Sequence, residues 1–163
     1  MVTASTPLGS YLELFDELHN LAFGRDPVWW RNLREDAMAI FRESGFPTTR
    51  DEDWRFTNVA SLAKTTFHRA VKGEVSLSAQ DLEPYRLAGS GCELVFINGH
   101  FSPQFSTIED LIPGVTVSSL AKAIRQYPEL IESHLGRYVD TRRDAFAALN
   151  TAMFDDEIGR AHV

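Results

Sequence analysis

The feature that most constrains the fold is the helical spacing of apolar side chains between Tyr11 and Gly45. Apolar residues recur every three or four positions from Tyr11 to Ala22 and again from Trp30 to Phe41, which places them on one face of an α-helix. Asp26-Pro27 predicts the start of the second helix, with Asp26 as N-cap and Pro27 as the first helical residue. Gly45 predicts its end. The two segments together predict a helical hairpin.

After Gly91 the pattern changes to strands and turns. Glu93–Ile97 predicts a strand, and the Asn98-Gly99 pair that follows is a strong hairpin signal. The return strand is expected over His100–Phe105, weakened by Pro103. Further elements are predicted as a strand at Val115–Val117 and as helices at Ser61–Lys64, at Ala79–Leu87 with Ser78 as N-cap, from the N-cap Ser118 to about Gln126, from Pro128 to near Gly136, and from Arg142 to Phe154. This order predicts a helical N-terminal part that leads into a β structure.

Composition excludes several classes of protein. The 163 residues carry a formal net charge of −7 without a cluster of Lys and Arg, so no nucleic-acid partner is predicted. No apolar run approaches the ~20 residues that a membrane helix needs, so no membrane association is predicted. The chain has one cysteine and therefore no internal disulfide, which suits a reducing compartment. These properties predict a cytoplasmic protein.

No catalytic, cofactor-binding or metal-binding residue is predicted. No two of the five histidines stand four residues apart, the spacing that brings two ligands together on one helix, although a site built from distant residues stays open. Cys92 could be a nucleophile or a cluster ligand, but one thiolate is a quarter of the usual iron–sulfur ligand set. A small buried residue is the favoured interpretation of Cys92.

Three other patterns have structural explanations. Gly89-Ser90-Gly91 lacks the preceding strand and the following glycine-led helix of a phosphate-binding loop, so a turn is predicted. The acidic runs Asp51-Glu52-Asp53 and Asp155-Asp156-Glu157 are predicted to be solvated. Trp54-Arg55-Phe56-Thr57 is less ordinary, because its aromatic rings interrupt a charged segment. Either Trp54 and Phe56 pin this segment onto the helical hairpin, which we favour, or they form an anchor for a partner protein.

Three stretches of the sequence resemble the SufD family of iron–sulfur cluster assembly proteins. The segment from Phe46-Pro47 to Asn58 is similar to that family's P…E-x-W-[KR]-[YF]-T pattern. Leu94–Ser102, LVFINGHFS, is similar to its strand–Asn-Gly–strand. Phe146–Phe154, FAALNTAMF, followed by two aspartates, is similar to its F-x-x-L-N-x-A-x-F-x-D-G. The three stretches stand in the family's order, and the resemblance extends from about residue 10 to residue 156.

The resemblance implies a fold and a role. The fold class would be α+β, with a helical N-terminal region at residues 1–90 and residues 91–156 leading into a right-handed parallel β-helix whose core lies outside the chain. The protein would be a non-enzymatic scaffold subunit that forms a hetero-oligomer with SufB and the ATPase SufC. That complex handles an iron–sulfur cluster and has been associated with flavin. The family's cluster-assembly residues lie beyond residue 156, so none is carried onto this chain and no cofactor is expected in this segment.

The last seven residues, Glu157 to Val163, do not continue the family pattern. They are similar to the translation of a widely used sequencing adapter, so residues 157–163 are predicted to be a non-native tail. The alternative is a genuine short C-terminus. Two other kinds of function stay open: a small stand-alone enzyme that uses Cys92 or a histidine, and a helical adaptor of unknown partner.

Overall fold

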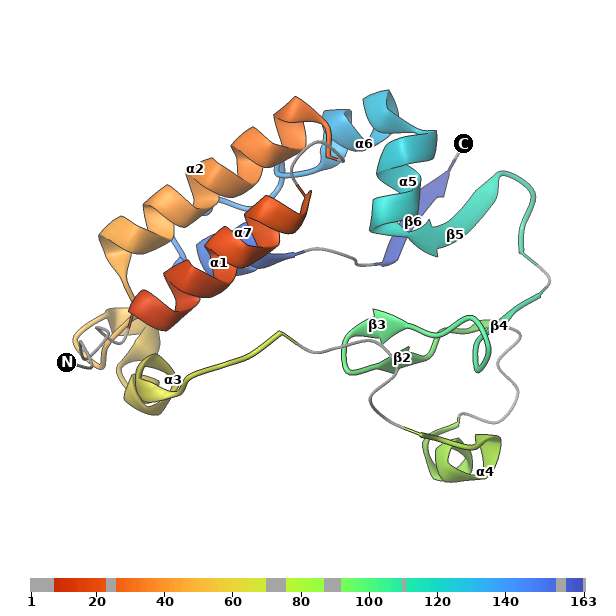
Figure 1. Cartoon of the computed structure of the whole chain (residues 1–163), viewed down its shortest axis with the longest axis horizontal. Coiled ribbons are helices and arrows are strands. Elements are labelled where there is room, and N and C mark those ends of the chain that lie inside the picture. Colours follow the sequence, from red (N-terminus) through yellow and green to blue (C-terminus); the bar gives the residue numbers. More distant parts are fainter. Residues whose placement is uncertain are drawn as a thin grey trace. The chain divides into compact units, whose positions relative to one another are not determined.

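The computed structural model describes residues 8–22, 26–69, 76–86, 92–109, 111–154 and 158–162, which are mostly helical with a few short strands (Figure 1). The chain divides into two compact units. Unit 1 comprises Met1–Arg69 and Glu129–Asp155, and unit 2 comprises Ala70–Pro128 and Asp156–Val163. Both units are discontinuous in sequence. The domains expected from the sequence, with boundaries at residues 90/91 and 156/157, are continuous segments of the chain. These boundaries stay a prediction.

Unit 1 is built around three helices. Helices α1 and α2 are neighbouring and antiparallel, which confirms the predicted hairpin (Figure 1). Helix α7, which comes near the end of the sequence, packs against both of them. Short helical elements lie between and beside them. The helices are α1 (Gly9–Ala22), α2 (Val28–Ser44), α3 (Ala60–Lys64), α6 (Pro128–His134) and α7 (Ala145–Met153), with a 3-10 turn at Glu52–Trp54.

The core of unit 1 lies where α1, α2 and α7 meet. Aromatic and aliphatic side chains of α1 and α2 pack there against the small side chains of α7, since Ala148 and Ala152 are completely buried. Full burial of a ring such as that of Phe41 stabilises the fold by about 1.5–3 kcal/mol. The buried cluster consists of Tyr11, Phe15, Ala37, Met38, Phe41, Ala148 and Ala152.

Tyr11 also fastens the hairpin to α3. Its hydroxyl donates a hydrogen bond to the carbonyl oxygen of Leu62 at 2.8 Å. Burial raises the pKa of the Tyr11 phenol, so the group stays neutral and remains a donor. The short helix α3 is thereby held at the base of α1.

Arg34 is the one charged side chain among the buried described residues, with an exposed fraction of 1 %. It comes from the middle of α2. Its Nε donates a hydrogen bond to the carbonyl oxygen of Ala152 at 3.0 Å, and its Nη1 lies 3.4 Å from a carboxylate oxygen of Asp26. The last carbonyls of a helix have no partners within the helix and carry its negative end. Arg34 therefore joins α2 to the C-terminal turn of α7 and to the segment that precedes α2.

The start of α2 differs from the prediction. Pro27, not Asp26, is the N-cap, and its carbonyl oxygen accepts the N–H groups of Trp30 and Arg31. The Asp26 carboxylate instead faces Arg34, a buried cation that attracts it more strongly than neutral backbone N–H groups do. Gly45 ends the helix as predicted, with a φ of +65°.

Helix α7 begins three residues later than the predicted start at Arg142. Asp144 has extended backbone angles, and its carboxylate accepts the N–H groups of Phe146 and Ala147. A carboxylate that meets these donors before the first helical turn fixes the start of the helix. The apolar side chains expected on one side, such as Leu149 and Met153, border the core rather than fill it.

Unit 2 contains short antiparallel strand pairs. The predicted hairpin is confirmed, with Phe96 opposite Phe101 and Ile97 opposite His100. Its turn residues Asn98 and Gly99 have φ values of 51° and 81°, which a two-residue hairpin of this kind needs. The elements are α4 (Ala79–Leu82), a 3-10 turn at Glu83–Tyr85, β1 (Cys92–Glu93), β2 (Phe96–Ile97), β3 (His100–Phe101), β4 (Thr107–Ile108), β5 (Val115–Ser119), α5 (Leu120–Gln126) and β6 (Ile158–His162).

Several predicted bounds in unit 2 need correction. The strand expected at Glu93–Ile97 is interrupted at residues 94–95, because β1 pairs with β4 whereas β2 pairs with β3. The return strand ends at Phe101, before a turn in which the N–H of Phe105 bonds to the carbonyl of Ser102. The helix expected at Ala79–Leu87 ends at Leu82 and continues as the 3-10 turn, while residue 87 lies outside the described residues.

Two serines show how capping works in unit 2. Ser78 precedes α4 as predicted, and its N–H and hydroxyl both donate to the Asp81 carboxylate, which lowers the pKa of Asp81. For α5 the cap is Ser119 rather than Ser118, because the Ser119 hydroxyl accepts the N–H of Lys122. Ser118 belongs to β5, which pairs with β6 in antiparallel register.

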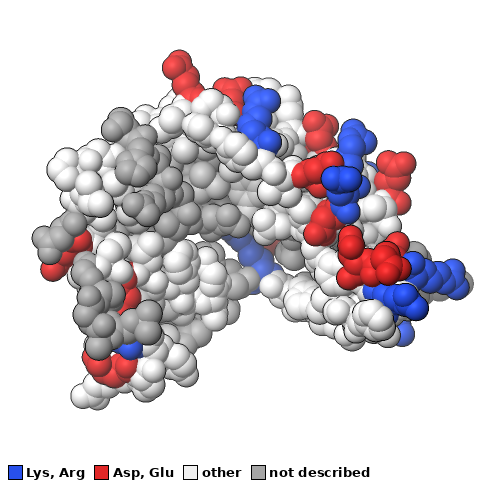
Figure 2. Space-filling model, turned by 180° about the vertical axis from the view of Figure 1, so that it is seen from behind, with Lys and Arg blue, Asp and Glu red and all other residues white. Residues whose placement is uncertain are grey.

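Apart from Arg34, the charged side chains of the described residues lie wholly or partly at the surface. On the face drawn in Figure 2, Lys and Arg side chains lie among Asp and Glu side chains instead of forming a continuous basic patch. Within the part of the chain that the structure describes, no helix has the length and apolar character needed to cross a bilayer.

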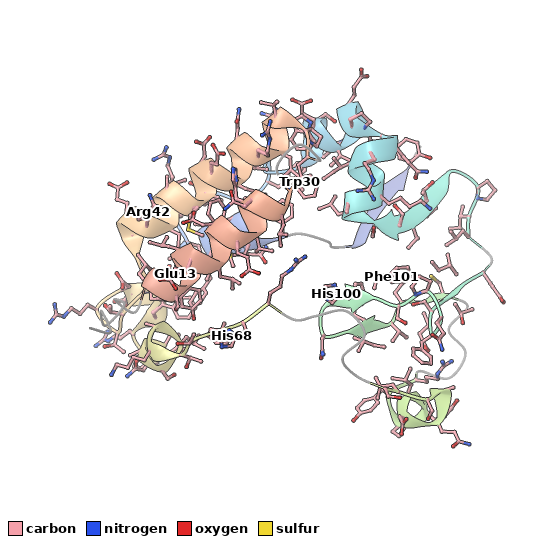
Figure 3. All side chains as sticks on the ribbon, viewed as in Figure 1. Glu13, Trp30, Arg42, His68, His100 and Phe101 are labelled. Carbon is pink, nitrogen blue, oxygen red and sulfur yellow. The ribbon has the colours of Figure 1, made fainter. Side chains whose placement is uncertain are left out.

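We predict that Arg34→Met lowers the free energy of unfolding by about 3 kcal/mol, because the substitution removes the buried donor of the Ala152 carbonyl and the cation that faces the Asp26 carboxylate. Urea denaturation measures the change. Arg42→Met is the matched control, since Arg42 lies on the same helix and is exposed (Figure 3); it should change stability by less than about 0.5 kcal/mol. Equal effects of the two substitutions would contradict the role assigned to Arg34.

Candidate functional site

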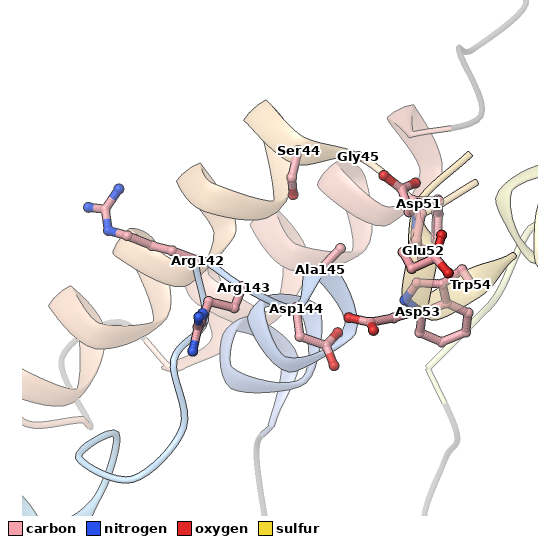
Figure 4. A pocket seen from close by; sticks show the side chains of 12 residues that line it. Ser44, Gly45, Asp51, Glu52, Asp53, Trp54, Arg142, Arg143, Asp144 and Ala145 are labelled. Atoms are coloured by element: carbon pink, nitrogen blue, oxygen red, sulfur yellow. The ribbon is translucent and has the colours of Figure 1, made fainter. Parts of the chain in front are cut away.

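A pocket of about 340 Å³ lies in unit 1 between the end of α2 and the start of α7 (Figure 4). One wall is the loop after α2, and the other is the segment that leads into α7. The two walls are separated by roughly ninety residues of sequence but share the same helical core. The pocket is lined by Ser44, Gly45, Phe46, Pro47, Asp51, Glu52, Asp53, Trp54, Arg142, Arg143, Asp144 and Ala145.

The loop wall is held by successive backbone turns. The Asp51 carboxylate accepts the N–H of Thr48 at 2.7 Å and its hydroxyl at 3.1 Å. The carbonyl of Asp51 accepts the N–H of Trp54 at 2.9 Å, and the carbonyl of Trp54 accepts the N–H of Thr57 at 2.9 Å. Each turn begins where the previous one ends, so the loop has a defined conformation without long secondary structure.

Asp144 organises the opposite wall. One oxygen, Oδ1, accepts the N–H groups of Phe146 at 2.8 Å and Ala147 at 3.2 Å. Because α7 is anchored in the core by Ala148 and Ala152, this carboxylate has a fixed position at the pocket. The signal for it in the sequence is an aspartate directly before an apolar helical run, which the predicted start at Arg142 overlooks.

Trp54 joins the two walls. Its ring centroid lies 5.0 Å from that of Phe146 on α7. Phe46 completes the group, with its ring 5.7 Å from Phe146 and 5.1 Å from Phe41. The prediction placed Trp54 against the helical hairpin of α1 and α2, whereas its ring contact is with Phe146 of α7. Two stretches that carry the family resemblance thus meet at this site.

Phe56 contradicts the same prediction. Its exposed fraction is 94 %, so it does not hold the segment to the hairpin. The Arg55 guanidinium lies 5.5 Å from the centre of the Phe56 ring and 3.9 Å from a carboxylate oxygen of Glu52. The turn that brings Thr57 back to Trp54 directs Phe56 away from the core.

Acidic groups gather at one end of the pocket. Asp51, Glu52 and Asp53 lie on the loop wall, and the carboxylates of Asp53 and Asp144 are turned towards the same space (Figure 4). Arg142 and Arg143 lie at the other end, and Arg142 points away from these carboxylates. The predicted solvation of the run 51–53 is confirmed, since all three residues are exposed.

The histidines of the described residues are distributed over both units. His68 follows α3 in unit 1, whereas His100 lies in β3 of unit 2 (Figure 3). His19 is paired with Glu35 at 3.3 Å, and His134 shares a hydrogen bond with Tyr138 at 2.6 Å. No group of three or more His, Cys, Asp or Glu side chains suited to a metal ion occurs within the ranges described above.

The prediction that Cys92 is a small buried residue is wrong. It is exposed rather than buried, and it lies in the two-residue strand β1 opposite Ile108 of β4. The predicted turn at Gly89-Ser90-Gly91 and the acidic run 155–157 lie outside the described residues.

Comparison with known proteins identifies the family. Residues 6–159 match the model of the SufBD protein N-terminal region. The chain belongs to the SufBD family. It is 33 % identical over 126 residues to the iron–sulfur cluster assembly SufBD family protein slr0076 of Synechocystis, and 51 % identical over 153 residues to the SufBD family protein ABCI9 of Arabidopsis thaliana. The chloroplastic SufBD family protein ABCI8 of Arabidopsis thaliana is 49 % identical over 149 residues.

These alignments cover most of this chain and a small part of each relative. They include 77 %, 81 % and 80 % of this chain but only 27 %, 32 % and 26 % of slr0076, ABCI9 and ABCI8. The chain thus spans about a quarter to a third of the length of these SufBD proteins. No solved structure matches it. The resemblance seen in the sequence is confirmed at the level of the family.

We predict that Asp144→Ala destabilises unit 1 by about 1 kcal/mol, since two N–H groups at the start of α7 lose their acceptor. Amide hydrogen exchange at Phe146 and Ala147 should become faster. Asp144→Ser restores an oxygen acceptor and should recover most of the stability. An alanine variant as stable as the parent protein would show that the cap does not fix α7.

Proposed function

We propose that this chain is the N-terminal region of a SufD-type scaffold subunit of the SUF machinery for iron–sulfur cluster assembly. The observation that carries the proposal is the match of residues 6–159 to the SufBD N-terminal region. The relatives named above are described as iron–sulfur cluster assembly proteins. The full-length protein would work in the cytoplasm as a hetero-oligomer with SufB and the ATPase SufC.

The choice of SufD over its paralogue SufB rests on one segment. Trp54-Arg55-Phe56-Thr57 stands early in the chain, as the SufD resemblance implies. The structure gives this segment a physical task, because Trp54 joins the loop to α7 through Phe146. The position of the motif in the chain is what supports SufD over SufB, and its packing is a separate structural property.

The fold beyond the described residues is also part of the proposal. Residues 91–156 would lead into a right-handed parallel β-helix, and residues 157–163 would be a non-native tail. The strands of unit 2 follow the helices of α1 and α2 in the chain, as this arrangement requires. The pairing of β6 with β5 is compatible with a non-native β6, because backbone groups form the ladder whatever the side chains are.

The role would be that of a scaffold, not of a catalyst, with the iron–sulfur cluster as cargo of the whole complex. Flavin, which the resemblance associates with that complex, has poor charge complementarity with the acidic end of the pocket of unit 1. The flavin nucleotides carry phosphate groups, and Asp53 and Asp144 face the pocket with negative charge. Flavin binding is therefore not assigned to this segment.

We predict that the protein, tagged at its N-terminus at its own chromosomal locus, co-purifies with SufB and SufC in defined stoichiometry. Mass spectrometry of the purified complex identifies the partners. It also gives the mass of the tagged chain, which the proposal expects to be well above the 18.4 kDa of these 163 residues.

Two results would count against the proposal. A tagged product of about 18 kDa would show that the tail is genuine. A longer product without SufB and SufC would remove the SUF assignment and favour the enzyme or adaptor alternatives.

A further inference from the structure

The strongest unexplained feature of unit 1 is an exposed aromatic residue, Phe56, two positions after Trp54, which lines the pocket. Phe56 is 94 % exposed, the highest value among the large exposed hydrophobic side chains of the described residues. It sits in a turn closed by the hydrogen bond from Thr57 to Trp54. A ring that is presented to water by a defined turn contributes nothing to the core, and its preorganisation lowers the entropy lost on binding a partner.

The pocket that the same loop lines has an excess of acidic side chains and includes the aromatic residues Phe46 and Trp54. The residues that line it include four carboxylates and two guanidinium groups, and Arg142 is directed away from the carboxylates (Figure 4). Trp54, two residues before Phe56, lines the same pocket. The acidic end therefore offers a cation opposite charge close to an indole ring.

We propose that the loop Asp51–Thr57 and the adjoining pocket form a docking surface for an extended segment of a partner protein that carries an arginine. The guanidinium group enters the acidic end between Asp53 and Asp144, with its aliphatic stem against Trp54. An apolar side chain one or two residues away packs on Phe56. The inference deepens the proposed function and rests on it only in taking the partner to be a protein.

Charge complementarity selects this occupant. A carboxylate can bind the planar guanidinium through two parallel hydrogen bonds, which a lysine ammonium cannot make. Asp144 accepts the N–H groups of its helix through Oδ1, so Oδ2 is not engaged by the start of α7, and the carboxylate as a whole is turned towards the pocket (Figure 4). An acidic peptide or a nucleic acid would meet repulsion from the same carboxylates.

The test uses the ¹⁵N-labelled 163-residue chain and the peptide acetyl-Arg-Gly-Leu-amide, followed by NMR. The expected result is saturable shifts of amide signals at residues 51–57 and 144–146. The same peptide with citrulline in place of arginine has nearly the same shape without the charge, and it should bind about five-fold more weakly. Equal affinity for the two peptides, shifts confined to other residues, or no saturation up to about 10 mM would overturn the proposal.

Two substitutions separate the parts of the surface. Phe56→Ser should weaken binding of the Arg-Gly-Leu peptide about three-fold or more but leave the binding of acetyl-arginine-amide unchanged, whereas Asp53→Asn should weaken both. Both residues are exposed, so the fold does not depend on them. Tyr85→Ser is the matched control, because Tyr85 is 83 % exposed and belongs to unit 2. If Phe56→Ser has no more effect than Tyr85→Ser, Phe56 has no part in docking. Because the peptide test needs neither SufB nor SufC, its failure is distinct from failure of the SUF assignment.

Discussion

The fold of unit 1 depends on a buried charged side chain, that of Arg34. Arg34 is buried in the middle of α2 and bonds to the carbonyl of Ala152, 118 residues further along the chain. A buried guanidinium without partners costs several kcal/mol, so α2 is fully stabilised only when the end of α7 and the Asp26 carboxylate are in place. The same contact positions the pocket, because Asp144 caps the start of α7 and Ala152, the acceptor of Arg34, lies in its last turn. Removal of this pairing would loosen the pocket wall as well as the core.

The helical hairpin could be predicted because its signal is local. Apolar spacing defines α1 and α2 within each helix, and Gly45 ends α2 by adopting a positive φ. Arg34 could not be predicted, since an arginine in an apolar stripe is ordinarily assigned to the surface and its acceptor comes from a distant helix. The caps were misplaced by one to three residues for a related reason. Whether Asp26, Ser118 or Arg142 begins a helix depends on the backbone turn, and at each place a tertiary contact or a neighbouring acceptor decides it.

The candidate site could be predicted only in part. Trp54 and Phe56 look alike in sequence, two rings in a charged segment, and the structural interpretation treated them as a pair. The turn from Trp54 to Thr57 separates them, since it directs Trp54 to Phe146 and Phe56 to solvent. The pocket has no signature in sequence because its walls come from residues 44–54 and 142–145. Only the return of the chain to α7 brings them together.

The three stretches that carry the family resemblance have different physical tasks. The stretch with Asn98-Gly99 needs two positive φ values to reverse the chain in unit 2. The stretches with Trp54 and Phe146 form one contact in unit 1. Packing and turn geometry account for each of these residues but not for Phe56. The loop Asp51–Thr57 would keep its shape without the Phe56 ring. A residue that gains nothing from folding and exposes an aromatic ring to water is a liability for solubility. A binding partner that covers the ring removes that liability, and the acidic pocket that the same loop lines indicates the charge that such a partner would carry.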